Sequence, residues 1–374
     1  MKFKKVLQVN KLYPYTGGIE KVVQQLAEGL KDEVDMEVLA CRERGLTQRE
    51  NLNGVPVVRA GSLGVLFSLP ISIPFLWYIR KLSRDKDVIQ FHMPFPLGDL
   101  GCLLSGFKGK VVVWWHSDVV RQKTLMKFYR PIMEKFLKRA DIIIVATQGH
   151  IDGSDYLPKY REKCVIIPYG LDQEIEKKAD KYIAKEEAGR LHIQNIKGAV
   201  NFLFVGRLVY YKGCEVLLDA FRFIQGATLT IIGTGKLEES LKKAANEYEI
   251  LDRVQFMGQV DNDQLSAAFE SCDVFVLPSI YKSEAFGIVQ IEAMAYGKPV
   301  INTKLPSGAP YVSIDQITGI TVPPHDACAL ADAMQWMVDH PEKRIEMGNR
   351  ARERVKQDFR TNDMLGKVLA IYQE

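Results

Sequence analysis

Short, unbroken runs of Val, Ile, Leu and Phe recur along the chain, separated by longer stretches in which apolar residues repeat every three or four positions. Continuous apolar runs of about four to eight residues are typical of strands covered on both faces, and the longer repeat is typical of helices. The first half holds such runs at residues 4–10, 36–40, 87–92, 110–116, 141–147 and 164–170. The second half holds them at residues 201–207, 227–233, 254–258, 273–279, 298–303 and 319–324. The pattern predicts an α/β protein with two doubly wound, mostly parallel sheets.

The chain length of 374 residues also favours two domains, because it exceeds what one hydrophobic core usually serves. Residues 172–198 are polar and charged, carry no strand signal and are interpreted as the linker. We predict one Rossmann-like domain over residues 1–172 and a second over residues 173–355. A final amphipathic helix over residues 356–374 is expected to pack on another element.

Composition and cysteine spacing indicate an ordinary globular protein of a reducing compartment. Apolar residues make up 47% of the chain and charged residues 26%, which excludes fibres and disorder. The six cysteines are widely spaced without a CxxC pair, which argues against a zinc site and a disulfide framework. The N-terminus has neither the apolar core nor the cleavage site of a signal peptide. We therefore expect a cytoplasmic protein.

The net charge of +4 is unevenly distributed. Residues 1–172 hold 26 Lys and Arg against 18 Asp and Glu, a balance of +8, whereas the remainder hold 24 against 28, a balance of −4. The basic first half suggests an anionic partner, such as a membrane surface or a phosphorylated ligand.

Candidate binding residues stand just after the predicted strands. Ligands of open α/β sheets bind at the carboxyl ends of the strands, so two facing domains would line a cleft with those ends. Gly17 and Gly18 follow the first strand and precede a helix expected from about Ile19, whose first amides suit an anion. A strand-to-helix turn without a ligand is the alternative for this glycine pair.

Two histidines stand at similar positions. His116, with Asp118, follows the run at 110–116, and His92 ends the run at 87–92. A histidine and an acid at a strand's carboxyl end are placed to hydrogen-bond a polar ligand. The alternative is a buried histidine whose nitrogens are satisfied inside the fold.

Two cations and two acids in the second half form the strongest chemical pattern. Arg207 and Lys212 lie five positions apart after a strand, where a forked guanidinium and an ammonium can neutralise a diphosphate. Glu284 lies in a loop and Glu292 about one turn inside the next helix, so both can accept hydrogen bonds from hydroxyl groups of one elongated ligand. The main-chain amides at 286–288 are candidates for an anion.

Together these motifs resemble family 4 glycosyltransferases of the GT-B fold. The resemblance rests on "EAFGIVQIE" with its two acids, "GRLVYYKG" with its two cations, the glycine pair after the first strand and the histidine after "VVVWW". It covers nearly the whole chain, and it implies that the final helix crosses back to the N-terminal domain. It further implies two facing Rossmann-like domains with an interdomain cleft, and retaining sugar transfer from a nucleotide sugar without an obligatory metal or other cofactor.

The resemblance also implies roles for individual residues. Glu284 would hold hydroxyls of the donor sugar and Glu292 the ribose, while Arg207 and Lys212 would stabilise the departing diphosphate. A phosphate oxygen of the donor itself would take the acceptor proton, so that no protein nucleophile is required. The supporting contacts implied are the glycine loop at Gly17 and Gly18, the amides of Phe286, Gly287 and Ile288, the donor-sugar contact of His116, and the base-bordering main chain of Gly258, Gln259 and Val260.

The donor and acceptor are expected from weaker signals. The segment 302–324 loosely resembles bacterial mannosyl and rhamnosyl transferases of polysaccharide assembly, with Ser307, Gly308 and Pro310 where many relatives carry a glycine and an acid. GDP-mannose is therefore the first prediction and a UDP-sugar the second.

A lipid-linked acceptor is suggested by residues 121–141, which interleave seven Lys or Arg with apolar residues and suit an interfacial helix on anionic lipid. The apolar segment 63–81 is interrupted by Pro70 and Pro74 and is short for a membrane span. The protein is thus expected at the inner face of the cell membrane, with a polyprenyl-diphosphate-linked glycan as acceptor. Two ordinary core-facing helices are the alternative.

Three other functions stay open at this point. A nucleotide-sugar epimerase would also need a diphosphate site, and formation of an epimer without acceptor would reveal it. A noncatalytic nucleotide-sugar-binding partner subunit would bind without turnover. A Rossmann dehydrogenase is disfavoured, because GxGxxG follows neither first strand.

Overall fold

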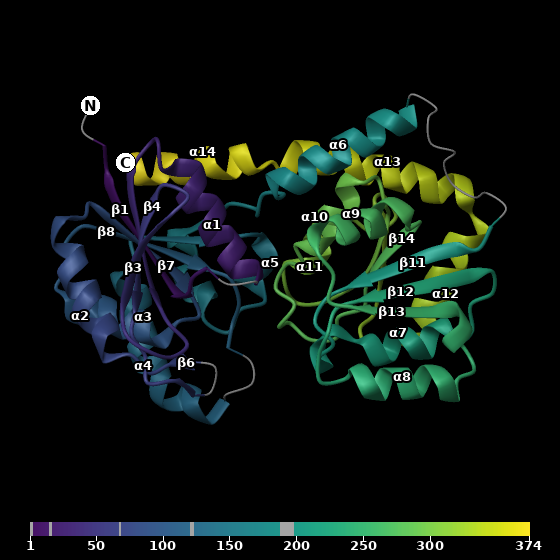
Figure 1. Cartoon of the computed structure of the whole chain (residues 1–374), viewed down its shortest axis with the longest axis horizontal. Coiled ribbons are helices and arrows are strands. Elements are labelled where there is room, and N and C mark those ends of the chain that lie inside the picture. Colours follow the sequence, from purple (N-terminus) through teal and green to yellow (C-terminus); the bar gives the residue numbers. More distant parts are fainter. Residues whose placement is uncertain (1–2, 15–16, 67–68, 120–122, 188–197) are drawn as a thin grey trace. The chain divides into compact units, whose positions relative to one another are not determined.

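A computed structural model describes residues 3–14, 17–66, 69–119, 123–187 and 198–374 of the chain. The chain forms two compact units (Figure 1). Unit 1 comprises Met1–Tyr169 and Thr361–Glu374, and unit 2 comprises Gly170–Arg360. Parts of three predicted segments lie outside the described residues: 188–197 of the linker, 121–122 of the basic helix and 67–68 of the apolar segment.

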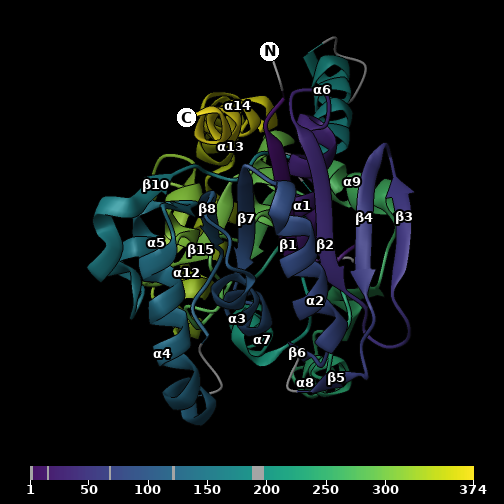
Figure 2. The ribbon, with the colours of Figure 1, turned by 90° about the vertical axis from the view of Figure 1, so that its left-hand side faces the viewer.

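Unit 1 is built on an eight-stranded sheet with the order β10-β9-β8-β7-β1-β2-β4-β3. The strands are β1 (Lys5–Leu12), β2 (Asp35–Cys41), β3 (Gln48–Leu52), β4 (Val55–Ala60), β7 (Val88–Met93), β8 (Lys110–Trp115), β9 (Ile142–Val145) and β10 (Cys164–Ile166). Figure 2 shows β7, β1, β2, β4 and β3 following one another across the sheet. All neighbours are parallel except β3 and β4, and the chain order reverses between β1 and β7. The six predicted runs are confirmed as strands.

The β3–β4 hairpin was not predicted. Its outer strand β3 is polar and largely exposed, because it stands at the edge of the sheet. Leu52 pairs with Val55, which leaves a two-residue turn of Asn53 and Gly54, both with positive φ. Asn-Gly between short strands is a hairpin signal that could have located it. A second small hairpin joins β5 (Val65–Leu66) and β6 (Leu69–Pro70).

Helices cover both faces of the sheet in unit 1. The helices are α1 (Gly18–Leu30), α2 (Ile73–Leu82), α3 (Pro96–Ser105), α4 (Lys123–Arg139), α5 (Gln148–Asp152) and α14 (Thr361–Gln373). Apolar side chains of α2, α3, α4 and α5 share one core with Leu7, Phe91 and Val113 of the sheet. The opposite face carries Gln8 and Gln90, whose side chains hydrogen-bond α14.

Unit 2 is built on a six-stranded parallel sheet with the order β13-β12-β11-β14-β15-β16. The strands are β11 (Val200–Val205), β12 (Ala227–Ile232), β13 (Val254–Gly258), β14 (Val274–Leu277), β15 (Val300–Thr303) and β16 (Gly319–Val322). All six predicted runs are confirmed. This is the doubly wound order of a dinucleotide-binding fold, and it reverses between β11 and β14.

Two layers of helices sandwich this sheet (Figure 1). They are α6 (Gln173–Glu187), α7 (Cys214–Phe221), α8 (Glu238–Glu247), α9 (Asn262–Ser271), α10 (Val289–Ala295), α11 (Ala309–Val312), α12 (Ala327–Asp339) and α13 (Pro341–Asp358). Helices α7, α8 and α12 pack their apolar side chains on one face of the sheet. Helices α9 and α10 lie on the other side in Figure 1.

Interpreting residues 172–198 as a linker is wrong for its first part. Residues 173–187 form α6, which belongs to unit 2 and buries Tyr182 and Ile183. Lys298 Nζ donates to Tyr182 Oη at 3.3 Å and fixes the helix to the chain between α10 and β15. At the other end, α13 continues to Asp358, so the final helix begins at Thr361 rather than 356.

Candidate active site

The carboxyl ends of β11 and β14 bring together two of the predicted site residues. Lys212 ends the short 3-10 helix Tyr210–Lys212 after β11, and Glu284 lies in the loop after β14. Lys212 Nζ lies 2.6 Å from Glu284 Oε2. Ser279 Oγ donates to the same oxygen at 2.8 Å. The ion pair therefore spans the point where the strand order of unit 2 reverses, which is where α/β sheets bind ligands.

This ion pair is almost fully removed from solvent. The Lys212 side chain is 11% exposed and the Glu284 side chain 8%. Burial opposes the charge on Lys212 by desolvation, but the charge and hydrogen bond of Glu284 outweigh it, and the pKa of Lys212 is raised above its usual value. The Lys212 ammonium thus stays charged beside the Glu284 carboxylate, and the two groups can meet an anion and a hydroxyl group.

A close backbone contact fixes Lys212 beside β14. Gly213 has φ +68, and a Cβ there would lie 1.9 Å from the carbonyl oxygen of Pro278. Only glycine permits both this conformation and this approach. The amide of Ile280 also donates to the carbonyl of Tyr211 at 2.8 Å. The glycine of the "YYKG" stretch therefore sets the distance between the cation and the acid.

Arg207 lies on the same edge of the sheet but is exposed. Its Nη2 donates to the Tyr211 hydroxyl at 3.2 Å, so the guanidinium is held near the 3-10 helix that carries Lys212. Two backbone hydrogen bonds hold the loop that carries Arg207. The Gly206 amide donates to the Ile232 carbonyl at the end of β12, and the Leu208 amide donates to the Thr234 carbonyl just after β12, each at 2.9 Å. The GTG stretch at 233–235 thus serves the arginine loop.

The second acid lies in the next helix. Glu292 is the fourth residue of α10 and is 5% exposed. Phe286, Gly287 and Ile288 directly precede α10, which begins at Val289, one residue after the predicted start, and Phe286 is 2% exposed.

The 305–310 loop contacts that turn. The Gly308 amide donates to the Ala285 carbonyl at 2.7 Å, and Gln290 Nε2 donates to the carbonyls of Phe286 at 3.0 Å and Ala309 at 3.2 Å. The loop that contains Ser307 and Pro310 is therefore anchored next to the residue that follows Glu284.

The predicted base-bordering residues stand two strands from β11. Gly258 ends β13, and Gln259 and Val260 lead into α9. Gly258 accepts a hydrogen bond from the Gly233 amide at 2.7 Å, with open space beside its Cα. They lie on the same carboxyl edge of the sheet as Lys212.

In unit 1, the glycine pair opens α1 at Gly18, one residue before the predicted start. The Gly17 carbonyl accepts from the Lys21 amide at 3.0 Å. Glu20 lies in the first turn, and its carboxylate would be only 2.3 Å from a Cβ at Gly17. The positive end of α1 therefore already faces an acid of its own chain, which an incoming anion would have to displace.

His116 lies one residue beyond β8 and is 4% exposed. Its Nε2 lies 3.0 Å from His92 Nδ1, and its Nδ1 lies 2.7 Å from the Tyr169 hydroxyl. Burial lowers the pKa of His92 to about 3 and the pKa of His116 well below its usual value. Both rings are therefore neutral and engaged within unit 1. A position after a strand did not exclude an internally satisfied histidine.

Asp118 is held by protein donors. Its carboxylate accepts from Trp115 Nε1 at 3.1 Å, Ser154 Oγ at 2.7 Å and the Asp155 amide at 2.8 Å. These bonds give Asp118 a structural role, because they tie the end of β8 to the chain after α5, whereas its contact with a polar ligand stays a prediction.

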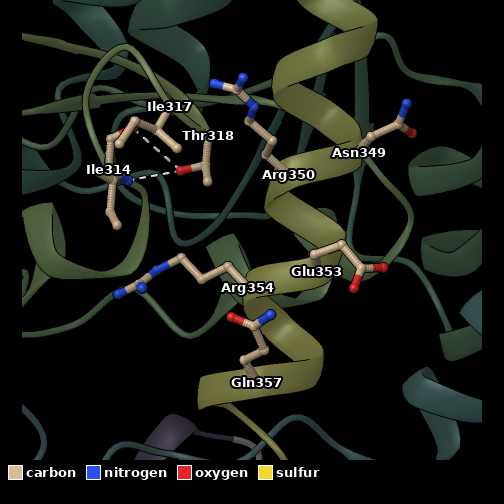
Figure 3. A pocket seen from close by; sticks show the side chains of 8 residues that line it. All are labelled: Ile314, Ile317, Thr318, Asn349, Arg350, Glu353, Arg354 and Gln357. Atoms are coloured by element: carbon tan, nitrogen blue, oxygen red, sulfur yellow. Dashed lines mark hydrogen bonds between the residues drawn. The ribbon is translucent and has the colours of Figure 1, made fainter.

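A pocket of about 330 Å³ lies away from these residues, between α13 and residues 314–318 (Figure 3). Arg354 on its wall donates to the carbonyls of Val312 at 3.0 Å and Tyr311 at 2.8 Å. The arginine thus anchors the end of α11, whose first residue Ala309 contacts Gln290. Arg354 therefore supports the 305–310 loop through α11.

Comparison with known proteins shows which protein family the chain matches. The model for glycosyltransferase family 4 matches residues 16–175, and the model for glycosyl transferases group 1 matches residues 191–354. The D-rhamnosyltransferase WbpZ of Pseudomonas aeruginosa is 38% identical over 347 residues, which is 92% of this chain and 88% of the relative. The O-antigen chain mannosyltransferase C of Escherichia coli is 32% identical over 374 residues, 98% of each chain.

Solved structures show the same fold at lower identity. The sucrose-phosphate synthase from Thermosynechococcus elongatus has a TM-score of 0.80 at 22% identity and covers 99% of this chain and 98% of its own. Anabaena HepE in complex with UDP has a TM-score of 0.77 at 17% identity, with 99% of each chain covered.

The two units are thus those of a nucleotide-sugar-dependent glycosyltransferase of the GT-B fold. The chain belongs to glycosyltransferase family 4, and the family and fold predicted from the motifs are confirmed.

The buried ion pair makes a stability prediction. Because Lys212→Ala leaves the buried Glu284 carboxylate without its cation, this substitution should lower the free energy of unfolding by on the order of 3 kcal/mol. The double variant Lys212→Met with Glu284→Gln removes both charges and should recover most of that loss. Urea unfolding of the three proteins measures this. Equal stability of the single variant and the wild type would contradict the ion pair.

Proposed function

We propose that the protein is a retaining hexosyltransferase that moves mannose from GDP-mannose to a hydroxyl group of a lipid-linked glycan during cell-surface polysaccharide synthesis. A UDP-sugar is the second candidate donor. The names of the two relatives, a D-rhamnosyltransferase and an O-antigen chain mannosyltransferase, support transfer of a hexose in polysaccharide assembly. No obligatory metal enters the proposal.

The Lys212–Glu284 ion pair is the observation that carries this proposal. A nucleotide sugar has an anionic diphosphate directly bonded to a ring of hydroxyl groups. The pair offers a cation and a carboxylate 2.6 Å apart at the reversal point of the sheet, so one can meet the diphosphate while the other accepts from a sugar hydroxyl. Charge that develops on the leaving diphosphate would be met by Lys212 and by Arg207 beside it.

The remaining roles follow the family resemblance. Unit 2 binds the donor, with Glu292 on the ribose, the amides of 286–288 on phosphate and the main chain of 258–260 along the base. Unit 1 binds the acceptor and contributes Gly17, Gly18 and His116. The donor's phosphate oxygen takes the proton from the attacking hydroxyl on the same face, which gives retention of configuration.

An anionic membrane surface is the proposed location of the acceptor. In the described part of the chain, no helix is long and apolar enough to cross a membrane. The predicted interfacial helix needs correction, because Met133, Phe136 and Leu137 of α4 lie in the core of unit 1. Only Phe128, 80% exposed, points outward among the large apolar side chains described there.

The β5–β6 hairpin and α2 carry a surface that suits a membrane better than α4 does. This apolar ledge consists of the exposed side chains of Leu63, Val65, Leu66, Ile71, Ile73 and Trp77. Exposed Arg80, Lys81 and Arg84 follow it, and Lys81 Nζ lies 4.8 Å from the centre of the Trp77 ring. Apolar side chains bordered by cations match the interface of an anionic bilayer.

The donor is tested by thermal unfolding with GDP, UDP, GDP-mannose, UDP-glucose and UDP-N-acetylglucosamine. A ligand that binds the native state stabilises it by about 2.7 kcal/mol at a hundredfold excess over its Kd. We expect the guanine compounds to raise the Tm. A rise in the Tm with the uracil compounds alone would show that the donor is a UDP-sugar and not GDP-mannose. Conversion of the donor to its epimer without an acceptor would show that the protein is an epimerase and not a transferase.

Membrane binding is tested by sedimentation with anionic phospholipid vesicles. Leu66→Ser with Trp77→Ser should weaken binding at least about tenfold, because two apolar side chains no longer enter the interface. Phe223→Ser, an exposed aromatic of unit 2, is the matched control and should bind like the wild type. Added salt should weaken the binding further. Equal sedimentation of the ledge variant and the control would refute this surface.

A further inference from the structure

A continuous chain of buried hydrogen bonds leads from the C-terminal helix to His116 inside unit 1. Its members are Tyr372 of α14, Gln8 of β1, Gln90 and His92 of β7, His116 after β8, and Tyr169. None of these side chains is more than 4% exposed. A buried polar chain of this length is costly unless its groups are paired as donor and acceptor. Each hydrogen bond in the chain therefore has one atom that donates the hydrogen and one that accepts it.

The strand register brings these groups together. Gln8 on β1 pairs with Gln90 on the neighbouring β7, and His92 follows two residues later on the same face. Trp114 on β8 pairs with His92, and its ring stacks on both histidine rings and on Tyr169. The stack holds the rings nearly parallel, which fixes the directions of their nitrogens.

The distances fix which atoms carry hydrogen. His92 Nε2 lies 2.7 Å from Gln8 Oε1, an oxygen that can only accept, and 3.3 Å from Gln90 Nε2, a nitrogen that can only donate. The shorter contact assigns the hydrogen to His92 Nε2, so the longer one is a contact between two donors and not a hydrogen bond. The neutral ring then leaves His92 Nδ1 as an acceptor, and His116 Nε2 must donate to it at 3.0 Å. His116 Nδ1 in turn accepts from the Tyr169 hydroxyl at 2.7 Å.

The far end of the chain fixes the amide of Gln8. Gln8 Nε2 donates to the Tyr372 hydroxyl at 2.7 Å, and that hydroxyl donates to Gln90 Oε1 at 2.7 Å. Because the Gln8 amide nitrogen is turned toward Tyr372, its oxygen faces His92. The Tyr372 hydroxyl, which accepts from one amide and donates to the other, therefore couples the orientations of Gln8 and Gln90, and the Gln8 oxygen sets the bonds from His92 to His116.

We propose that Tyr372 and His92 are positioning residues that hold His116 neutral, with its hydrogen on Nε2 and an accepting lone pair on Nδ1. Nδ1 can receive only a donor, such as the Tyr169 hydroxyl or, in its place, a hydroxyl of the sugar donor. This functional consequence rests on the role of His116 in the proposed transfer, whereas the tautomer itself does not.

Nitrogen NMR of the histidine rings in the full chain tests the tautomer without substrate. The wild type should show a pyrrole-type Nε2 and a pyridine-type Nδ1 at His116. Tyr372→Phe keeps the ring but removes the hydroxyl, and should give a mixture of both tautomers. Tyr160→Phe removes a hydroxyl of unit 1 that bonds the Glu134 carbonyl outside the chain, and should leave the signals unchanged.

Transfer kinetics with the same proteins test the functional part. Tyr372→Phe should lower kcat/KM for the donor about tenfold, the value of one hydrogen bond, with Tyr160→Phe at the wild-type rate. A hydrogen on Nδ1 in the wild type, or an unchanged tautomer in Tyr372→Phe, overturns the inference whether or not the protein transfers sugar. A mixed tautomer with an unchanged kcat/KM overturns the positioning role alone.

Discussion

The Lys212–Glu284 ion pair is the interaction on which the proposed chemistry of unit 2 depends. Two charges with little access to water persist only because each compensates the other, and Ser279 adds a hydrogen bond to the acid. A site of this kind is already polarised before a ligand arrives. In the proposed function it would therefore meet a diphosphate and a sugar hydroxyl with groups that need little rearrangement, which is the condition for effective electrostatic stabilisation.

Much of the surrounding structure serves to hold these two side chains. Gly213 lets the backbone beside Lys212 contact Pro278, the residue just after β14. The Gly308 amide bonds Ala285 and so holds the 305–310 loop next to Glu284. Arg354 of α13 anchors the end of α11, the helix that follows this loop. In unit 1 the corresponding organisation is the buried chain around His116. In both units, other residues fix the atoms to which the proposed chemistry is assigned.

The sequence predicted every strand of the two described sheets except β3 and β4, because a strand buried on both faces must be continuously apolar and such runs are hard to mistake. It missed β3 and α6 because a polar edge strand and a polar surface helix give no apolar run, and it missed β4, the short buried strand between β2 and β3. The family motifs located Lys212 and Glu284, but their pairing across 72 positions depends on strand order, which single-sequence patterns do not give. The internal partners of His116 and Asp118 were equally hidden, since they come from distant strands and loops.

The affinity for GDP without its sugar tests the central claim most directly, with wild type and Glu284→Gln compared by calorimetry. Glu284 now shares Lys212 and repels an anion, so removing its charge should tighten GDP binding several-fold while sugar transfer is lost. If UDP proves to be the nucleotide that raises the Tm, it takes the place of GDP. Weaker nucleotide binding in Glu284→Gln, or unchanged transfer, would contradict the assignment of Lys212 to the diphosphate and Glu284 to the sugar.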